Sequence, residues 1–291
     1  MNNKLLTLFV LLITIISIGC VGLKTNQEID INELLKNASS EDTINLPNRI
    51  IYINTPIIIS KSNVFLIGDT NTVLFLESNK NCPVIIVGVQ EMSMVSNICI
   101  SNIKIDGNRT NQSKELWKYS KLGYPIYNNG IIIQNAQNIF VDHLQSYDCI
   151  SGGFVTTFGV SFLMVSNYTA FNNQFDGLAC YQTTNSVFVN LFLFNNLAAG
   201  ISLDMDFNYN FFDNIFLAYN TTGIFIRNSH QNIFQNVQAV GNKKFDIFMA
   251  SVNEKTNTGC LYNDFTIKGD GKIQNNDSLS VSNIFRQKLG N

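Results

Sequence analysis

The sequence predicts a right-handed parallel β-helix, a solenoid in which short strands stack coil upon coil, and three observations support this. The phrase Gly-apolar-x-apolar recurs at steps of 23 or 24 residues, beginning at Gly130, Gly153, Gly177, Gly200 and Gly223. Apolar and polar residues alternate within the copies, as in strands. The chain also contains 42 asparagines, which favour turns over strands and helix interiors.

The step length selects this architecture among the known repeats. Most helical repeats need about 33 residues or more, and the Leu-x-x-Leu-x-Leu frame of leucine-rich repeats is missing. A coil of three short strands and three turns fits the observed step. Neighbouring coils would stack ~4.8 Å apart, and asparagines at repeated turns would tolerate left-handed backbone and form amide ladders.

The N-terminus has the features of a secretory segment. The apolar run Leu5 to Ile18 is shorter than the ~20 residues that span a bilayer and has the length of a signal-peptide core. It ends in Ser-Ile-Gly-Cys at Cys20, which resembles the lipobox of bacterial and some archaeal lipoproteins. We predict a signal peptide at residues 1–19, a membrane-anchoring lipid on Cys20 and a tether at residues 20–28. Secretion without a lipid and an uncleaved anchor stay open as alternatives.

The remaining chain is expected to be one domain, a β-helix at residues 29–275 followed by a C-terminal tail at residues 276–291. The first segment, Ile29 to Asn37, is predicted to be a short helix. Its apolar residues fall on one helical face, namely Ile31, Leu34 and Leu35. Such a helix could cover the first coil, whose open strand edge would otherwise invite association.

Three segments after this helix resemble the pectin-lyase-like superfamily in their order. They are Thr43-Ile-Asn-Leu-Pro, then Ile57-Ile-Ile-Ser-Lys-Ser-Asn-Val-Phe-Leu-Ile-Gly-Asp, then Ile103-Lys-Ile-Asp-Gly-Asn. The resemblance covers about residues 29–270 and implies the β-helix fold. The superfamily includes polygalacturonases, pectate lyases and uncharacterised surface proteins, so the resemblance does not decide the activity.

Polygalacturonases are similar in their glycine-led strands, but their catalytic pattern is not reproduced here. They carry acidic residues near such strand starts, then Gly-His-Gly, then Arg-x-Lys. Among the residues that precede the five glycines only Asp176 is acidic, and Gly-His-Gly does not occur. Inverting hydrolysis needs two carboxyl groups, so Asp176 is interpreted as a turn residue before Gly177.

The positions four residues after each phrase start are mostly polar and are predicted to face outward. On successive coils they include Tyr181, Asp204 and Arg227, and Asp206 follows closely. Arginine could pair with a uronate carboxylate, tyrosine could stack on a sugar ring, and the two aspartates could bind Ca²⁺. The alternative is a surface Asp–Arg pair that contributes little to stability.

One segment, Gly107 to Asn128, departs from the repeat and carries the only tryptophan, Trp117. Inserted loops on solenoids often line the binding face, so Trp117 is a second candidate for a sugar contact. A loop packed by its own aromatic side chains is the alternative.

Apart from the possible Ca²⁺ at Asp204 and Asp206, no cofactor or metal site is predicted. Cys20 is followed by five cysteines without C-x-x-C spacing, which disfavours zinc and leaves their disulfide state open: Cys82, Cys99, Cys149, Cys180 and Cys260. His143 and His230 fall in different columns and are expected to be structural or solvated.

Charge and composition restrict the function classes. The net charge is −2 and the charged fraction is 14%, without a basic cluster, which argues against nucleic acid as a partner. Two hypotheses remain. The chain is a cell-surface β-helix that binds or processes an acidic polysaccharide as a lyase, epimerase or hydrolase, or it is a non-catalytic envelope protein that binds glycan or has a structural role.

Overall fold

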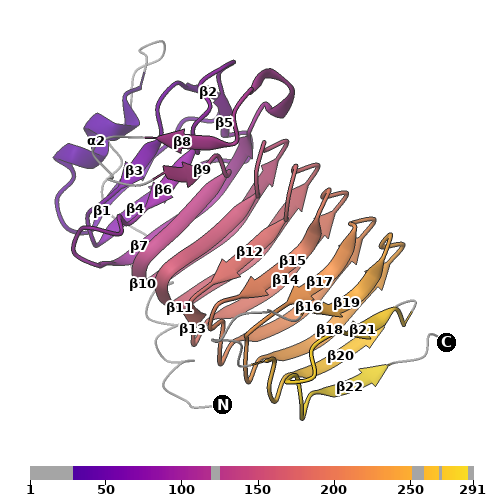
Figure 1. Ribbon diagram of the computed structural model, residues 1–291. Helices are drawn as coiled ribbons and strands as arrows, with labels where there is room; N and C mark the ends of the chain where they lie inside the picture. The colour runs from indigo at the N-terminus through magenta and orange to yellow at the C-terminus, as the bar shows by residue number, and fades with distance from the viewer. Residues whose placement is uncertain (1–28, 119–124, 251–258, 269–270, 288–291) are drawn as a thin grey trace. The chain divides into compact units, whose positions relative to one another are not determined.

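The computed structural model describes residues 29–118, 125–250, 259–268 and 271–287. The predicted signal peptide, Cys20 and the tether therefore lie outside the described residues. Within the compact unit Ile31–Asn291, the described chain forms a parallel β-solenoid of about nine turns with one short helix, as Figure 1 shows. The predicted fold class is confirmed. No helix of the described residues is long and apolar enough to cross a membrane.

Strands of successive coils pair in parallel along the whole solenoid. In chain order they are β1 (Asp42–Asn45), β2 (Ile50–Ile53), β3 (Ile57–Ile59), β4 (Val64–Ile67), β5 (Val73–Leu76), β6 (Ile85–Val87), β7 (Val95–Asp106), β8 (Leu116–Lys118), β9 (Pro125–Tyr127), β10 (Ile131–Tyr147), β11 (Phe154–Phe171), β12 (Leu178–Tyr181), β13 (Thr183–Thr184), β14 (Val187–Phe194), β15 (Ala199–Asp204), β16 (Phe211–Ala218), β17 (Thr222–Ile226), β18 (Ile233–Val240), β19 (Phe245–Met249), β20 (Asp264–Lys268), β21 (Ile273–Asn275) and β22 (Ile284–Gln287). A 3₁₀ turn, η1, spans Arg109–Asn111. The exception to parallel pairing is the antiparallel hairpin of β8 and β9.

The five glycines that mark the repeat stack in one column, as predicted. Their following residues are register partners from β10 through β11, β12 and β15 to β17. A Cβ atom at Gly130 would lie 2.6 Å from the carbonyl oxygen of Gly153, and one at Gly223 would lie 2.6 Å from that of Asp246. Neighbouring backbones approach so closely at this column that a side chain would not fit there.

The interior is filled by apolar columns and by stacked aromatic rings. The inward positions of the glycine-led strands are fully buried, for example Ile201 and Leu203 at 0% exposure. Phe188, Phe212 and Phe234 stack with ring centroids 4.6 and 4.5 Å apart. The same stack continues through two later rings, Phe265 and Phe285, so each coil contributes to one continuous core.

Asparagines form two buried ladders at the turns. The first contains Asn173, Asn196, Asn220 and Asn242, all at 0–1% exposure. Each amide nitrogen donates to the amide oxygen one coil further on, at 2.9 to 3.4 Å. The second ladder joins Asn210, Asn232, Asn263 and Asn283 in the same way. These ladders satisfy buried polar groups that a turn inside the solenoid would otherwise leave unpaired.

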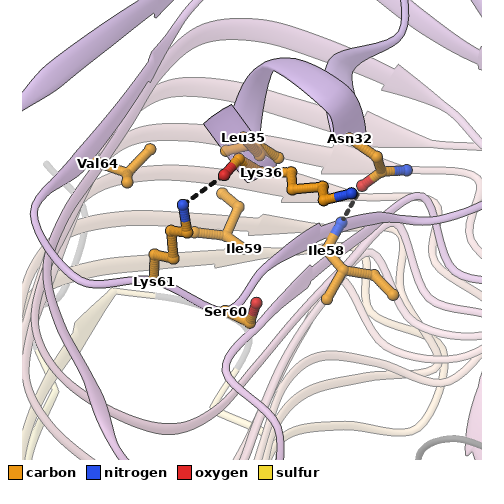
Figure 2. Close-up of a pocket in the computed structure, with 8 residues that line it drawn as sticks. All are labelled: Asn32, Leu35, Lys36, Ile58, Ile59, Ser60, Lys61 and Val64. Atoms are coloured by element: carbon orange, nitrogen blue, oxygen red, sulfur yellow. Dashed lines mark hydrogen bonds between the residues drawn. The ribbon is translucent and has the colours of Figure 1, made fainter. Parts of the chain in front are cut away.

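The helix α2 (Ile31–Asn37) begins two residues later than expected and buries Ile31 and Leu35. Figure 2 shows how its side chains meet the strand β3. The Asn32 amide accepts from the Ile58 N–H and donates to the Pro56 carbonyl, both at 2.9 Å. Lys61 donates to the carbonyl oxygen of Lys36 at 2.5 Å. That this helix protects the first coil against association stays a prediction.

The solenoid extends into the segment that was expected to be a tail. β22 pairs in register with β20, so the predicted boundary at residue 275 is too early. The reason is that Asn283 continues the second asparagine ladder from Asn263 and Phe285 stacks on Phe265 at 5.2 Å.

Candidate functional site

The candidate site lies where the glycine-led strands β12, β15 and β17 end on three successive coils. Register pairing places Tyr181 of β12 beside Asp204 of β15. Arg227 follows β17, and its backbone N–H donates to the Leu203 carbonyl of the preceding coil at 2.9 Å. The structure thus brings Tyr181, Asp204 and Arg227 together, because the repeat holds equivalent positions one coil apart.

Asp204 and Arg227 form an ion pair that is buried on the acid side. The side chain of Asp204 is 4% exposed and that of Arg227 is 35% exposed. Asp204 Oδ2 accepts from Arg227 Nε at 2.7 Å and from Nη2, and Oδ1 accepts from the Met205 N–H at 2.7 Å. Asp204 is therefore covered by Arg227 and is not itself exposed. Asp204 holds the guanidinium in one orientation, which presents its exposed edge at the surface.

Asp206 is not drawn into this pair. It is exposed and has a left-handed backbone, with φ 65°. Both oxygens of Asp204 already accept hydrogen bonds from the chain, and the described residues contain no group of three or more His, Cys, Asp or Glu side chains suited to a metal. Binding of Ca²⁺ between Asp204 and Asp206 stays an untested prediction.

Asp176 adds a carboxyl group with shifted acidity to the site. Its Oδ1 accepts from the Ala199 N–H at 2.7 Å. Burial raises the pKa of Asp176 to about 6, against the lowering effect of this hydrogen bond. Burial also raises the pKa of Tyr181, and the charge of Asp176 adds to this shift, while a hydrogen bond with Ser202 opposes it. Asp176 precedes the start of β12 and Tyr181 ends it, so the two groups are linked here through charge. A carboxyl group that titrates near pH 6 is suited to proton transfer.

Trp117 lies in the hairpin of β8 and β9, which covers the coils before the site (Figure 1). It is register-paired with Ile126 and packs against an apolar cluster that includes Ile86 and Ile132, with Val155 beside it. Val155 is the register partner of Ala179, two residues before Tyr181. The last coil that contacts the hairpin is therefore the one directly before the coil of Tyr181. Trp117 is partly buried by these apolar contacts.

The histidines and cysteines do not contribute to this cluster. His143 Nδ1 lies 2.6 Å from Asp142 Oδ2, and burial lowers the pKa of His230. The five described cysteines are free thiols. Burial raises the pKa of every one of them, which keeps a thiol unreactive: Cys82, Cys99, Cys149, Cys180 and Cys260.

Sequence reasoning assigned Asp176 to a turn and did not include it, or Ser202, in the site. The turn interpretation is correct as far as the hydrogen bond to Ala199 goes. The effect of Asp176 on the pKa of Tyr181 could not be predicted from the sequence. One feature sets Asp176 apart in the sequence: it is the only acidic residue that directly precedes a repeat glycine.

Comparisons with known proteins show the fold. No family model matches the sequence, and no curated protein matches it. The A-module of a mannuronan C-5 epimerase from Azotobacter vinelandii is similar in structure (TM-score 0.55, 14% identity, 85% of this chain and 86% of that chain). So is a surface adhesin of Streptococcus pneumoniae (0.60, 10%, 89% and 75%). A polygalacturonase from Erwinia carotovora also aligns (0.56, 14%, 90% and 93%). The chain thus shares its parallel β-helix fold with these solved structures, as its sequence predicts.

Proposed function

We propose that the protein binds a polysaccharide bearing carboxylate groups across the ends of β12, β15 and β17. The observation that carries this proposal is the Arg227 side chain, which is 35% exposed and is oriented by the buried carboxylate of Asp204. An oriented guanidinium recognises a carboxylate by charge-assisted hydrogen bonds. Tyr181 lies beside Asp204 on the preceding coil and adds an aromatic side chain to the same row.

The structural relatives support a polysaccharide as the ligand class. The epimerase and the polygalacturonase are named for mannuronan and polygalacturonate, which are polymers of uronic acids. The adhesin is named for a role at the cell surface. Because a fold hosts many functions, the choice of an acidic ligand for this chain depends on Arg227 and its neighbours.

Replacing the guanidinium tests the proposal. Arg227→Ala should weaken binding of an acidic oligosaccharide, such as an oligogalacturonide, by about ten- to a hundredfold, because it removes a charge-assisted contact. Binding of a neutral oligosaccharide of the same length should change by less than about twofold. Isothermal titration calorimetry or affinity electrophoresis measures both.

Two further variants keep this experiment interpretable. Arg227→Ala leaves the carboxylate of Asp204 buried without its cation, which itself destabilises a protein. A double variant, Asp204→Asn with Arg227→Ala, removes both charges and should fold yet bind the acidic ligand weakly. Arg286→Ala removes an exposed arginine that pairs with Asp264 and should bind as the parent does. Undiminished acidic binding by the folded double variant would contradict the proposed site.

A processing enzyme is the second candidate, and the shifted acidity of Asp176 favours it. A carboxyl group with a pKa of about 6 could exchange a proton with a bound sugar near neutral pH. Incubating the parent and Asp176→Asn with the bound polymer, followed by assays for reducing ends and unsaturated uronate, separates processing from binding alone. Product from the parent and none from the variant would assign the enzyme.

The location of the protein is part of the same proposal. A sugar polymer outside the cell requires an exported protein, and the apolar N-terminal run ending at Cys20 supplies the signal. We expect mass spectrometry of the mature protein to find Cys20 as the first residue, carrying a lipid. An unmodified Cys20, or cleavage at another residue, would contradict the anchor without affecting the proposed binding site.

A further inference from the structure

A second surface lies at the corner where each glycine-led strand turns into the next strand. Two backbone positions of this corner turn are left-handed on every coil of residues 158–231, with φ between 44° and 61°. At these two positions, successive coils alternate between apolar or aromatic side chains and amide side chains. Phe158 with Phe162, and Met205 with Tyr209, are apolar pairs. Gln182 with Asn185, and Asn228 with Gln231, are amide pairs on the coils between and after them.

The alternation continues at the second of these positions. The backbone N–H groups of Asn185, Tyr209 and Gln231 each donate to a backbone carbonyl of the next coil. The acceptor of the Gln231 N–H is Leu261, so the equivalent position on that coil is Tyr262. Tyr262 has φ 57° and is again aromatic. On earlier coils the same column is occupied by asparagine, at Asn97 and Asn138, for example.

Large side chains are unfavourable at such positions. Left-handed backbone suits glycine and asparagine, and a bulky residue there is strained. The aromatic side chains are also not buried in compensation, because Phe162 is 52% exposed, Tyr209 59% and Tyr262 61%. Strain without a gain in packing indicates a role in binding.

The rings of this column are too far apart to pack on one another. Successive aromatic residues lie two coil steps apart, with one coil between them. This corresponds to about 9.6 Å at ~4.8 Å per step, whereas the centroids of stacked rings lie within ~7 Å. Stacking within the described residues occurs elsewhere, between Tyr147 and Phe171, for example. Phe162, Tyr209 and Tyr262 therefore do not cover one another, and each is more than half exposed.

The corner carries little charge. The nine side chains that alternate there are uncharged, and Asp206, between Met205 and Tyr209, is the exposed acidic residue within it. Arg227, which directly precedes Asn228, pairs with Asp204. His230 lies between Asn228 and Gln231, and burial lowers its pKa, which favours the neutral imidazole. The corner residues thus offer an anionic polymer the carboxylate of Asp206 and no permanent cation of their own, which favours an uncharged ligand.

We propose that this corner, from Phe162 to Tyr262, binds a neutral, extended β-1,4-linked polysaccharide running along the solenoid axis. In such a chain each sugar is turned over relative to the one before, so the same C–H face recurs at every second sugar. That recurrence matches aromatic side chains on every second coil. The amides of Asn185 and Gln231 lie between them, where they can bond to the hydroxyl groups of the intervening sugars.

This inference goes beyond the acidic site because it concerns the turn that follows those strand ends and another ligand class. A lipid surface fits less well, since amide pairs interrupt the apolar pairs at every second coil. A second copy of the chain would need a continuous apolar area. Both serve as alternative outcomes of the experiment.

Replacing the tyrosines by asparagine tests the proposal without straining the fold. Tyr209→Asn and Tyr262→Asn each place a residue that tolerates left-handed backbone, so both variants should fold as well as the parent. We expect the parent to co-sediment with cellulose or chitin powder. The double variant should bind at least about tenfold more weakly.

Matched controls separate this surface from the acidic site. Tyr219→Asn removes a tyrosine that is 57% exposed and left-handed, with φ 56°, from a different turn, and it should bind the powders like the parent. Arg286→Ala, which removes the exposed partner of Asp264, should also leave this binding unchanged. The proposal is overturned if the parent binds neither powder, or if Tyr219→Asn weakens binding as much as the double variant does. It is equally overturned if the tyrosines instead support sedimentation with phosphatidylcholine vesicles or self-association.

Discussion

Asn220→Ala is expected to lower the free energy of unfolding by about 4 kcal/mol. The Asn220 side chain accepts from the backbone and side-chain nitrogens of Asn196 at 3.0 and 3.1 Å. It donates to the Leu193 carbonyl at 2.9 Å and to Asn242 Oδ1 at 3.4 Å. Alanine would leave these partners unsatisfied at a site with 0% exposure, where each lost bond carries its full desolvation cost.

Urea denaturation followed by circular dichroism measures this effect. Asn190→Gly is the matched control, because Asn190 belongs to an exposed ladder with Asn167 and Asn214 and has φ 57°. Glycine accepts that backbone geometry, and water replaces the lost bonds, so the control should cost less than about 1 kcal/mol. Equal losses for the two variants would show that burial does not set the value of the ladder.

Asp176→Asn is expected to stabilise the protein by on the order of 2 kcal/mol at pH 8 and by little at pH 3.5. The reason is that burial raises the pKa of Asp176 from 3.8 to about 6. Asparagine stays neutral at every pH and retains an oxygen that can accept from the Ala199 N–H, as Asp176 Oδ1 does at 2.7 Å.

The direction of this effect follows from proton linkage. Between pH 3.8 and about 6 the folded chain holds a proton on Asp176 that the unfolded chain has released. The stabilisation from that proton is fully present below pH 3.8 and is lost as the pH rises through about 6. Denaturation midpoints of parent and variant at pH 3.5, 5, 6.5 and 8 should therefore diverge with rising pH. A constant difference across the series would show that Asp176 ionises normally.

The glycine column and the interior strands could be predicted because the repeat itself encodes them. Glycine recurs in this column because a Cβ would lie 2.6 Å from the backbone of the next coil at Gly130 and Gly223 and 3.0 Å from it at Gly177 and Gly200. Alternation identified Ile201 and Leu203 as interior because apolar residues recur every second position on a strand. Both signals are local, and both survive small changes in coil length.

Other features depend on contacts that the sequence does not encode locally. Asp204 looked exposed, because the alternation cannot show that Arg227 folds over it. The pKa of Asp176 reflects burial by neighbouring coils. The aromatic column of the corner turn was hidden by uneven steps, since 24 residues separate Asn185 from Tyr209 and 31 separate Gln231 from Tyr262.

Each asparagine ladder also has an electrical direction. In both buried ladders the amide nitrogens donate toward the C-terminal coils, so the dipoles within each ladder add, as peptide dipoles do along a helix. The exposed ladder runs the other way, because Asn190 donates to Asn167 and Asn214 donates to Asn190, so its dipole opposes theirs. The first buried ladder also ends on partners of matching sign, since the Cys149 N–H donates to Asn173 Oδ1 and Asn242 donates to the carboxylate of Asp246. The charge at the two ends of this ladder is thus compensated inside the solenoid.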